Sequence, residues 1–166
     1  MKQIVLFTVA LLLLAGCEPP QRSNPSNNTT DSSSGINGTS INIKANSSGK
    51  FVCCDGDQNQ MIIGNRDRAA RWEEFRLIKI AGDTVAFKAS NGKYVCADMN
   101  NGGILSANRD KVGDWESFVM IPQKNNKVAF KASNNKYVSC DLDLKGILVA
   151  NRNVAKDWEL FIIIYK

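Results

Sequence analysis

The sequence predicts an all-β domain built from three similar units, and three observations lead to this fold class. A segment containing Asn-Arg and then Trp-Glu occurs three times at a spacing of 43 residues, as "NRDRAARWEEF" from Asn65, "NRDKVGDWESF" from Asn108 and "NRNVAKDWELF" from Asn151. Between these segments apolar residues alternate with period two, which is typical of strands and not of helices. Short turns rich in Gly and Asn separate the alternating runs. A fixed internal period of this length indicates a repeated structural unit.

The first residues have the features of an export signal. Lys2 precedes the apolar run Ile4 to Leu14, and the letters "LAGC" end at Cys17. A charged start, a short apolar middle and small residues at the end are typical of a secretory signal, too short to span a bilayer as a helix. The four letters resemble a bacterial lipobox, which implies cleavage before Cys17 and attachment of lipid to its thiol. We expect a lipoprotein signal peptide over 1–16 and lipidation of Cys17; an ordinary signal peptide with a chance cysteine is the alternative.

The next segment predicts a flexible tether. Residues 18–40 read "EPPQRSNPSNNTTDSSSGINGTS", with almost no large apolar side chain. Such a segment cannot bury enough surface to offset the entropy of ordering itself. We therefore expect a lipidated Cys17 and a disordered linker over 17–40. Because each buried methylene of an acyl chain such as palmitate adds about 0.8 kcal/mol, several chains would hold the protein firmly on a membrane. This places it in a bacterial cell envelope, at the outer membrane or cell surface in preference to the inner membrane.

From Ile41 to Lys166 the chain is repeat throughout, over 41–80, 84–123 and 127–166. Each copy opens with an alternating strand, such as "VAFKA" from Val85. A turn such as "SNGK" leads to a second strand, "KYVCAD", and a loop leads to a third, "ILSAN". The fourth begins at the tryptophan motif, "WESFVMI". Four short strands in each of three copies match the count of a β-trefoil, in which six strands close a barrel and six form hairpins that cap one end. Closure removes the exposed edges of an open sheet.

Each copy has apolar residues on one face only, so the three must meet around a common axis to bury them. The predicted barrel layers consist of Phe75, Phe118 and Phe161; Ile43, Phe87 and Phe130; and Ile62, Leu105 and Leu148. Burying one such side chain contributes about 1.5–3 kcal/mol. Trp72, Trp115 and Trp158 stand three residues before the phenylalanines, and we expect these rings to close the barrel floor.

The repeated polar residues of the motif fit two interpretations: they form a catalytic pocket, or they stabilise the fold in each repeat. Groups on different repeats lie about a third of a turn apart and cannot converge unless they reach the axis. Local ion pairs, with asparagine side chains holding turn backbone, explain the repetition more simply. We expect pairs of Arg66 with Glu73, Arg109 with Glu116 and Arg152 with Glu159. The structural repeat motif is therefore Asn65, Arg66, Trp72, Glu73, Phe75, Asn108, Arg109, Trp115, Glu116, Phe118, Asn151, Arg152, Trp158, Glu159 and Phe161.

Composition argues against several functions. The chain has no histidine, no Ser-His-Asp or Cys-His arrangement and no Gly-rich phosphate loop, so we expect no enzyme activity, no catalytic residues, no cofactor and no metal site. Asp55 and Asp57 more simply cap their loop. The formal net charge is +5 with the basic residues dispersed, and this favours a solvated surface over a nucleic-acid partner.

Four cysteines remain besides Cys17, and they fall in predicted strands without metal-ligand spacing: Cys53, Cys54, Cys96 and Cys140. We expect buried free thiols, with a disulfide in an oxidising compartment as the alternative.

The segment "FKASNGKYVCAD" and the following "GGILSANRDKVGDWESF" resemble the fascin-like β-trefoil family, with its "GKYV", "ANR" and "WE-x-F" motifs, over all of Ile41 to Lys166. Fascin is an actin bundler with four such trefoils, whereas this chain holds one. Single fascin-like trefoils also occur attached to carbohydrate-active enzymes, so the resemblance implies glycan binding. The "Q-x-W" motif of ricin-type lectins is absent, and the sugar-contacting residues of that family cannot be transferred.

Two functions follow as hypotheses. The first is a membrane-anchored lipoprotein that displays a binding module, chiefly for a polysaccharide. The second is a protein-interaction or envelope-structural lipoprotein, which by family resemblance binds actin or another host protein. A single binding site would show itself as a departure from threefold symmetry: Arg71 replaces the aspartates of the other copies, Arg76 replaces Val119 and Ile162, and "GDQNQ" replaces "MNNGG". The ligand-binding residues, the ligand and the oligomeric state stay open.

Overall fold

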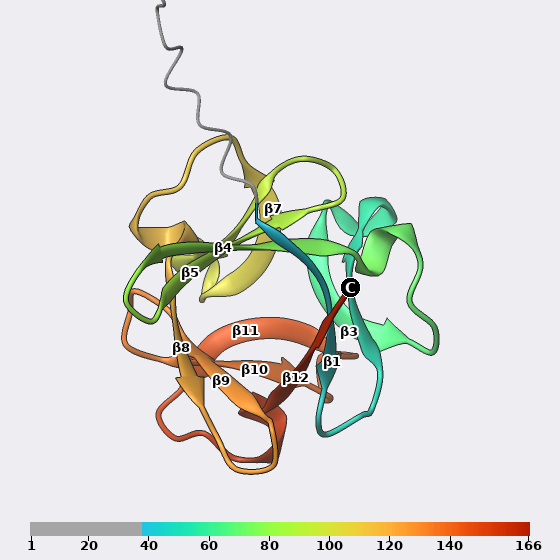
Figure 1. The fold of residues 1–166 in the computed structure, drawn as a ribbon, viewed down its shortest axis with the longest axis vertical. Coiled ribbons are helices and arrows are strands. Elements are labelled where there is room, and N and C mark those ends of the chain that lie inside the picture. The colour runs from blue at the N-terminus through green and yellow to red at the C-terminus, as the bar shows by residue number, and fades with distance from the viewer. Residues whose placement is uncertain (1–37) are drawn as a thin grey trace, which may run out of the picture. The chain divides into compact units, whose positions relative to one another are not determined.

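The computed structural model describes residues 38–166, so Cys17, the signal peptide and nearly all of the predicted linker lie outside the described residues. The described part is all-β, with short 3-10 turns between its strands (Figure 1). Over 38–166, none of the helical turns has the length and apolar character needed to cross a membrane. The strands are β1 (Thr39–Ala45), β2 (Phe51–Asp55), β3 (Met61–Arg66), β4 (Phe75–Ala81), β5 (Thr84–Ala89), β6 (Tyr94–Asp98), β7 (Ile104–Arg109), β8 (Phe118–Pro122), β9 (Val128–Lys131), β10 (Tyr137–Asp141), β11 (Ile147–Arg152) and β12 (Phe161–Tyr165).

The first and fourth strands of each repeat close a barrel. Pairing runs from β1 to β4, β5, β8, β9 and β12, and β12 returns to β1. All of these pairs are antiparallel. Because β12 pairs with β1 over five residues, the end of the repeat region is joined to its start, and the barrel has no open edge.

The second and third strands of each repeat form the hairpins β2–β3, β6–β7 and β10–β11. The hairpins meet one another through β3–β7, β7–β11 and β11–β3 contacts, which make a triangular cap. Each hairpin has its register shift at the same place, just after Phe51, Tyr94 and Tyr137. The predicted β-trefoil, with three units of four strands, is therefore confirmed.

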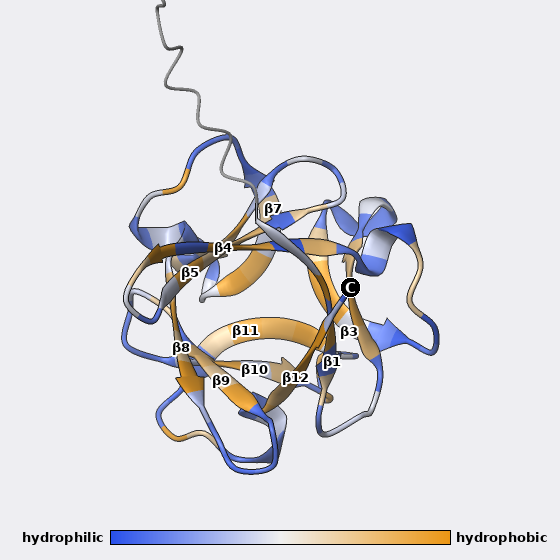
Figure 2. Cartoon of the chain, in the orientation of Figure 1, coloured by the Kyte–Doolittle hydropathy of each residue, from blue (hydrophilic) through white to orange (hydrophobic). Residues whose placement is uncertain are grey.

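All nine residues of the predicted barrel layers are buried in one core cluster. They surround a small apolar cavity of about 20 Å³, which Val52, Val95 and Val138 also line. The three valines complete a further layer that the sequence reading left out. Phe87 contacts Phe118 and Phe130 at centroid distances of 5.9 and 5.1 Å. Figure 2 shows the same division, with hydrophobic strands and mostly hydrophilic connections at the rim.

One departure from the repeat is a packing compensation. Gly64 stands where the other repeats have Ala107 and Ala150. A Cβ at Gly64 would lie 2.7 Å from Cys140 Sγ, which is closer than real contacts allow. The small residue in β3 therefore makes room for the thiol in β10.

Candidate functional site

Each repeat places its motif in a compact set of side chains at the barrel rim, here called a station. The first station consists of Asp55, Arg66, Trp72 and Glu73. The second consists of Asp98, Arg109, Trp115 and Glu116, and the third of Asp141, Arg152, Trp158 and Glu159. In every station Trp and Glu lie in a 3-10 turn, over Arg71–Glu73, Asp114–Glu116 or Asp157–Glu159, directly before the fourth strand.

The glutamate of each station is buried and caps the turn in which it lies. Its Oε2 accepts a hydrogen bond from a backbone N–H three residues earlier, at 2.7 Å from Ala70, 2.8 Å from Gly113 and 2.8 Å from Lys156. A carboxylate at the third position of the turn satisfies a donor that the turn leaves free. The glutamates therefore fix the course of the chain into the fourth strand.

The arginine of each station pairs with that glutamate, as predicted. The Nε to Oε1 distances are 3.9 Å for Arg66, 3.7 Å for Arg109 and 3.8 Å for Arg152. These ion pairs each join two residues of a single repeat. The repeated polar groups therefore assemble within stations and are not brought to a common centre.

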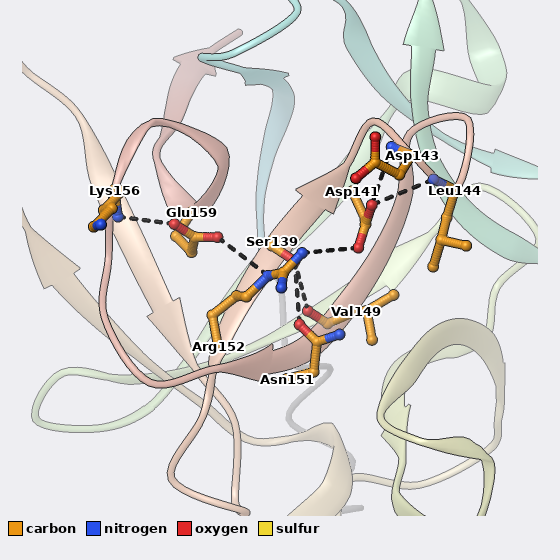
Figure 3. A network of polar contacts seen from close by, with 9 residues as sticks. All are labelled: Ser139, Asp141, Asp143, Leu144, Val149, Asn151, Arg152, Lys156 and Glu159. Carbon is orange, nitrogen blue, oxygen red and sulfur yellow. Dashed lines mark hydrogen bonds and ion pairs between the residues drawn. The ribbon is translucent and has the colours of Figure 1, made fainter.

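Two stations extend the ion pair to an aspartate. Arg152 Nη2 donates to Asp141 Oδ2 at 3.0 Å, and Arg66 does the same to Asp55 at 3.1 Å. Figure 3 shows Arg152 between Asp141 and Glu159. Asp55 Oδ1 also accepts from the backbone N–H of Asp57, which is the predicted loop cap. The second station differs, since no ion pair of Arg109 with Asp98 is found between residues 38 and 166.

The tryptophans do not close the barrel floor, and this prediction was wrong. Trp72 is 40% exposed, while Trp115 and Trp158 are half-buried. The phenylalanines and valines already fill the interior, so the larger rings lie outside it. The arginine of each station lies over the indole instead, with Cζ to centroid distances of 5.7, 5.9 and 5.7 Å. A guanidinium at this distance attracts the ring face and fixes its orientation.

The asparagines of the motif also differ from the prediction that they hold turn backbone. Asn65 Oδ1 accepts from Cys53 Sγ at 3.6 Å, and Asn108 Oδ1 accepts from Cys96 Sγ at 3.4 Å. They thus join the two strands of their own hairpin. The turns are held by Asn91 and Asn134, which the sequence reading did not select and which donate to the carbonyls of Ala107 and Ala150.

The four described cysteines are free and buried, as expected. Burial raises the pKa of the Cys54 and Cys140 thiols to about 11 and also raises that of Cys53. A thiol that stays protonated is a poor nucleophile and a poor metal ligand. Over residues 38–166 no group of three potential metal ligands is found either.

Shallow grooves border the tryptophans of the first and third stations. The third-station groove, of about 700 Å³, is lined by Arg152, Asn153, Val154, Lys156, Trp158 and their neighbours. Two grooves border Trp72. One, of about 410 Å³, contains Arg66, Arg68, Arg71 and Glu73. The other, of about 250 Å³, contains Gly56, Gln60, Arg71, Ser90 and Asn91.

The second groove at Trp72 draws on two repeats. Ser90 and Asn91 belong to the turn after β5, in the second repeat. The sequence reading flagged Arg71 and the loop "GDQNQ" as departures from symmetry, and the structure brings both to this groove. Ser90 and Asn91 were not predicted, because their place in the groove depends on how the turn after β5 packs against the loop between β2 and β3.

Comparison with protein families gives one assignment. The family model "Domain of unknown function (DUF7910)" matches residues 34–145 and 82–166. The chain belongs to this family. The match gives no support to a fascin-like assignment. A search of curated proteins found no significant match.

Among solved structures, the chain is similar to the designed threefold-symmetric protein ThreeFoil. The TM-score is 0.68 at 12% sequence identity, covering 75% of this chain and 97% of ThreeFoil. At this identity the likeness concerns the fold alone, and it agrees with the β-trefoil found here. A β-trefoil is a common binding module, and the fold is compatible with a carbohydrate or a protein as ligand.

Proposed function

We propose that this protein is a carbohydrate-binding module without catalytic activity, held at a bacterial envelope by lipid on Cys17. The proposal rests on the positions of the tryptophans and on the side chains around them. Each ring has an arginine over one side, and Trp72 and Trp158 line shallow grooves with polar walls. An indole combines a large apolar face with electron density that favours the C–H groups of a sugar ring. Surrounding amide and charged groups suit its hydroxyls.

Rigid presentation of the rings supports the same function. Each tryptophan lies in a turn fixed by a buried glutamate, and its arginine is tied to that glutamate. A side chain held before binding loses less entropy when a ligand arrives.

A glycan array with the full chain tests this function. We expect binding to at least one polysaccharide class, and at least tenfold weaker binding after replacement by Ala of whichever tryptophan carries the contact. Thermal unfolding separates loss of binding from loss of fold. Failure of the full chain to bind any glycan of a broad array would contradict the proposal.

The anchor requires its own experiment. The full chain should partition into the detergent phase and take up labelled palmitate in a bacterial host, whereas Cys17→Ser should do neither. A Cys17→Ser chain that still partitions and is still labelled would show that lipid is not attached there.

A protein partner is the second candidate, and exposed apolar side chains in the third repeat favour it. Leu142, Leu144 and Val154 are exposed, and Val154 borders the third-station groove. Exposed apolar groups of this kind are found where proteins bind one another. A stoichiometric protein captured from envelope or host extract, and lost with Leu144→Ser and Val154→Ser, would favour this function.

A further inference from the structure

The groove that joins the first and second repeats at Trp72 contains three departures from threefold symmetry. Three of its residues differ from their counterparts in a way that changes the surface. Gly56 stands where the others have Met99 and Leu142. Gln60 stands where the others have Gly103 and Gly146, and Arg71 where they have Asp114 and Asp157. These three changes all line one groove.

Gly56 leaves the tryptophan ring accessible. A Cβ added at Gly56 would lie 3.9 and 4.0 Å from two carbons of the Trp72 indole, so a side chain there would lie against the ring. Met99 and Leu142 place side chains at the corresponding positions. In keeping with this, Trp72 is exposed, whereas Trp115 and Trp158 are half-buried.

Gln60 has a positive φ, and the equivalent positions of the other two repeats are glycines. Its φ is 61°, against 81° at Gly103 and 86° at Gly146. A side chain at positive φ is disfavoured by about 1–3 kcal/mol, and residues strained in this way cluster at functional sites. Gly103 and Gly146 show that the fold needs no side chain at this position, so the glutamine has to be explained by what its side chain does.

The amide of Gln60 is oriented for a ligand. Its Oε1 accepts from Asn91 Nδ2 at 2.9 Å, which fixes the side chain across the repeat boundary. The Nε2 atom of the same amide lies 3.7 Å from where a Cβ on Gly56 would be. No hydrogen bond from this nitrogen is found in the part of the chain that the structure describes. A donor is thereby left close to Gly56 and to the exposed indole of Trp72.

Arg71 makes the two grooves that border Trp72 more positive than their counterparts, which have an aspartate at this position. The other groove that borders Trp72 is lined by Arg66, Arg68, Arg71 and one carboxylate, Glu73. The corresponding third-station groove has two cationic and three acidic side chains. Arg66 is paired with Asp55 and Glu73, but no ion pair of Arg68 or Arg71 is found over 38–166. Two unpaired guanidinium groups favour carboxylate or sulfate, which they bind through two hydrogen bonds at once.

We propose that the two grooves that border Trp72 together form the site that selects the ligand, and that this ligand is an acidic polysaccharide whose sugars carry carboxylate or sulfate groups. This inference rests on the proposed carbohydrate-binding function. A sugar ring stacks on Trp72, Gln60 Nε2 donates to a ring substituent, and Arg71 with Arg68 binds the anionic group. The second and third stations, with aspartate in place of Arg71, repel such a ligand.

Titration calorimetry of the full chain tests the proposal with polygalacturonate, alginate, hyaluronan and dextran sulfate. Methyl-esterified polygalacturonate and dextran serve as neutral counterparts. We expect at least tenfold tighter binding to an acidic polymer than to its neutral counterpart, weakening as salt screens the charges. The dextran sulfate arm and the three uronate arms distinguish sulfate from carboxylate as the anionic group.

Four variants locate the site. Arg71→Asp installs the residue of the other repeats, and we expect at least tenfold weaker binding to the acidic polymer. Lys111→Asp is the matched control, because Lys111 is the counterpart of Arg68 in the second repeat and the substitution changes net charge equally. It should change affinity less than twofold. Trp72→Ala should weaken binding at least tenfold and Trp158→Ala less than twofold, and Trp72→Phe keeps a ring in case the alanine variant unfolds.

Results that contradict these expectations separate failure of the site from failure of carbohydrate binding. Equal losses for Arg71→Asp and Lys111→Asp would show attraction by net charge alone and overturn the site. Equal affinity for neutral and acidic polymers, or dependence on Trp158, would also overturn it while leaving carbohydrate binding intact. Binding to neutral glycans on the array without binding to any acidic polymer has the same meaning. If no glycan binds at all, the proposed function itself fails.

Discussion

The interior of this trefoil keeps its threefold symmetry, whereas the rim departs from it around the tryptophans. In the interior the three phenylalanines that begin β4, β8 and β12 are all buried beside one axis, lining the same small cavity. At the rim the stations share the arginine–glutamate pair but differ in the groove around the tryptophan. Side chains that line this cavity share it with their counterparts from the other repeats, so a change in one repeat alters the packing around all three. Rim residues have no such contact, and one repeat can acquire a site alone.

The interior should show the largest effects. Phe118→Ala and Phe161→Ala should each destabilise the fold by about 3–5 kcal/mol, because each leaves a cavity in a close-packed core. Phe75→Ala should be milder by roughly 0.5–1.5 kcal/mol, since Phe118 and Phe161 each have an aromatic neighbour and none is found for Phe75 among residues 38–166. Chemical denaturation checks this, and a loss at Phe75 larger than the other two would break the comparison.

The stations should show intermediate effects that differ between repeats. Arg152→Ala leaves the buried Asp141 and Glu159 without their cation and should destabilise by about 2 kcal/mol. Arg109→Ala removes one ion pair and should cost about half as much. Denaturant midpoints of the two variants decide the matter, and equal losses would mean that the aspartate contact contributes nothing.

The buried thiols should make stability depend on alkaline pH. The Cys54 and Cys140 pKa values are raised to about 11 from 9.0, so their contribution is complete below pH 9 and is lost as the pH rises from 9 to 11. The loss should be about 1 kcal/mol for each thiol, allowing for partial screening. The second repeat has Ala97 at this position, which suggests the control: the Cys54→Ala, Cys140→Ala double variant should lose less stability over that range. Parallel curves for parent and variant would exclude the thiols as the cause.

The smallest effect should be a gain in stability. Gln60→Gly relieves a positive φ and should stabilise the fold by roughly 0.5–1 kcal/mol, while weakening binding at Trp72 because the amide is lost. Gly103→Gln is the opposite change in the second repeat and should destabilise, since a Cβ there would lie 2.7 Å from the Ala150 carbonyl oxygen. Thermal unfolding with parallel binding measurements checks both variants. A stabilised Gln60→Gly that binds unchanged would remove Gln60 from the site.

The sequence alone determined the fold and the nine residues of the predicted barrel layers. Alternation with period two, turns of Gly and Asn, and a repeat of 43 residues left a closed, threefold arrangement of twelve strands as the way to bury Phe75, Phe118 and Phe161 together. The pairs of Arg66 with Glu73 and of its two counterparts also followed, because their partners are near in sequence. Local spacing and periodicity suffice for such features.

The tertiary structure decided what depends on contacts between repeats. The sequence reading put the tryptophans in the barrel floor, but the volume inside is already filled by smaller side chains. It could not find Asn91 beside Gln60, or Gly64 beneath Cys140, because these partners lie 31 and 76 residues apart in the chain. The groove that joins the first and second repeats at Trp72 exists because the loop between β2 and β3 and the turn after β5 meet there. Local sequence patterns do not show which loops of different repeats lie together, because closure of the barrel brings them into contact.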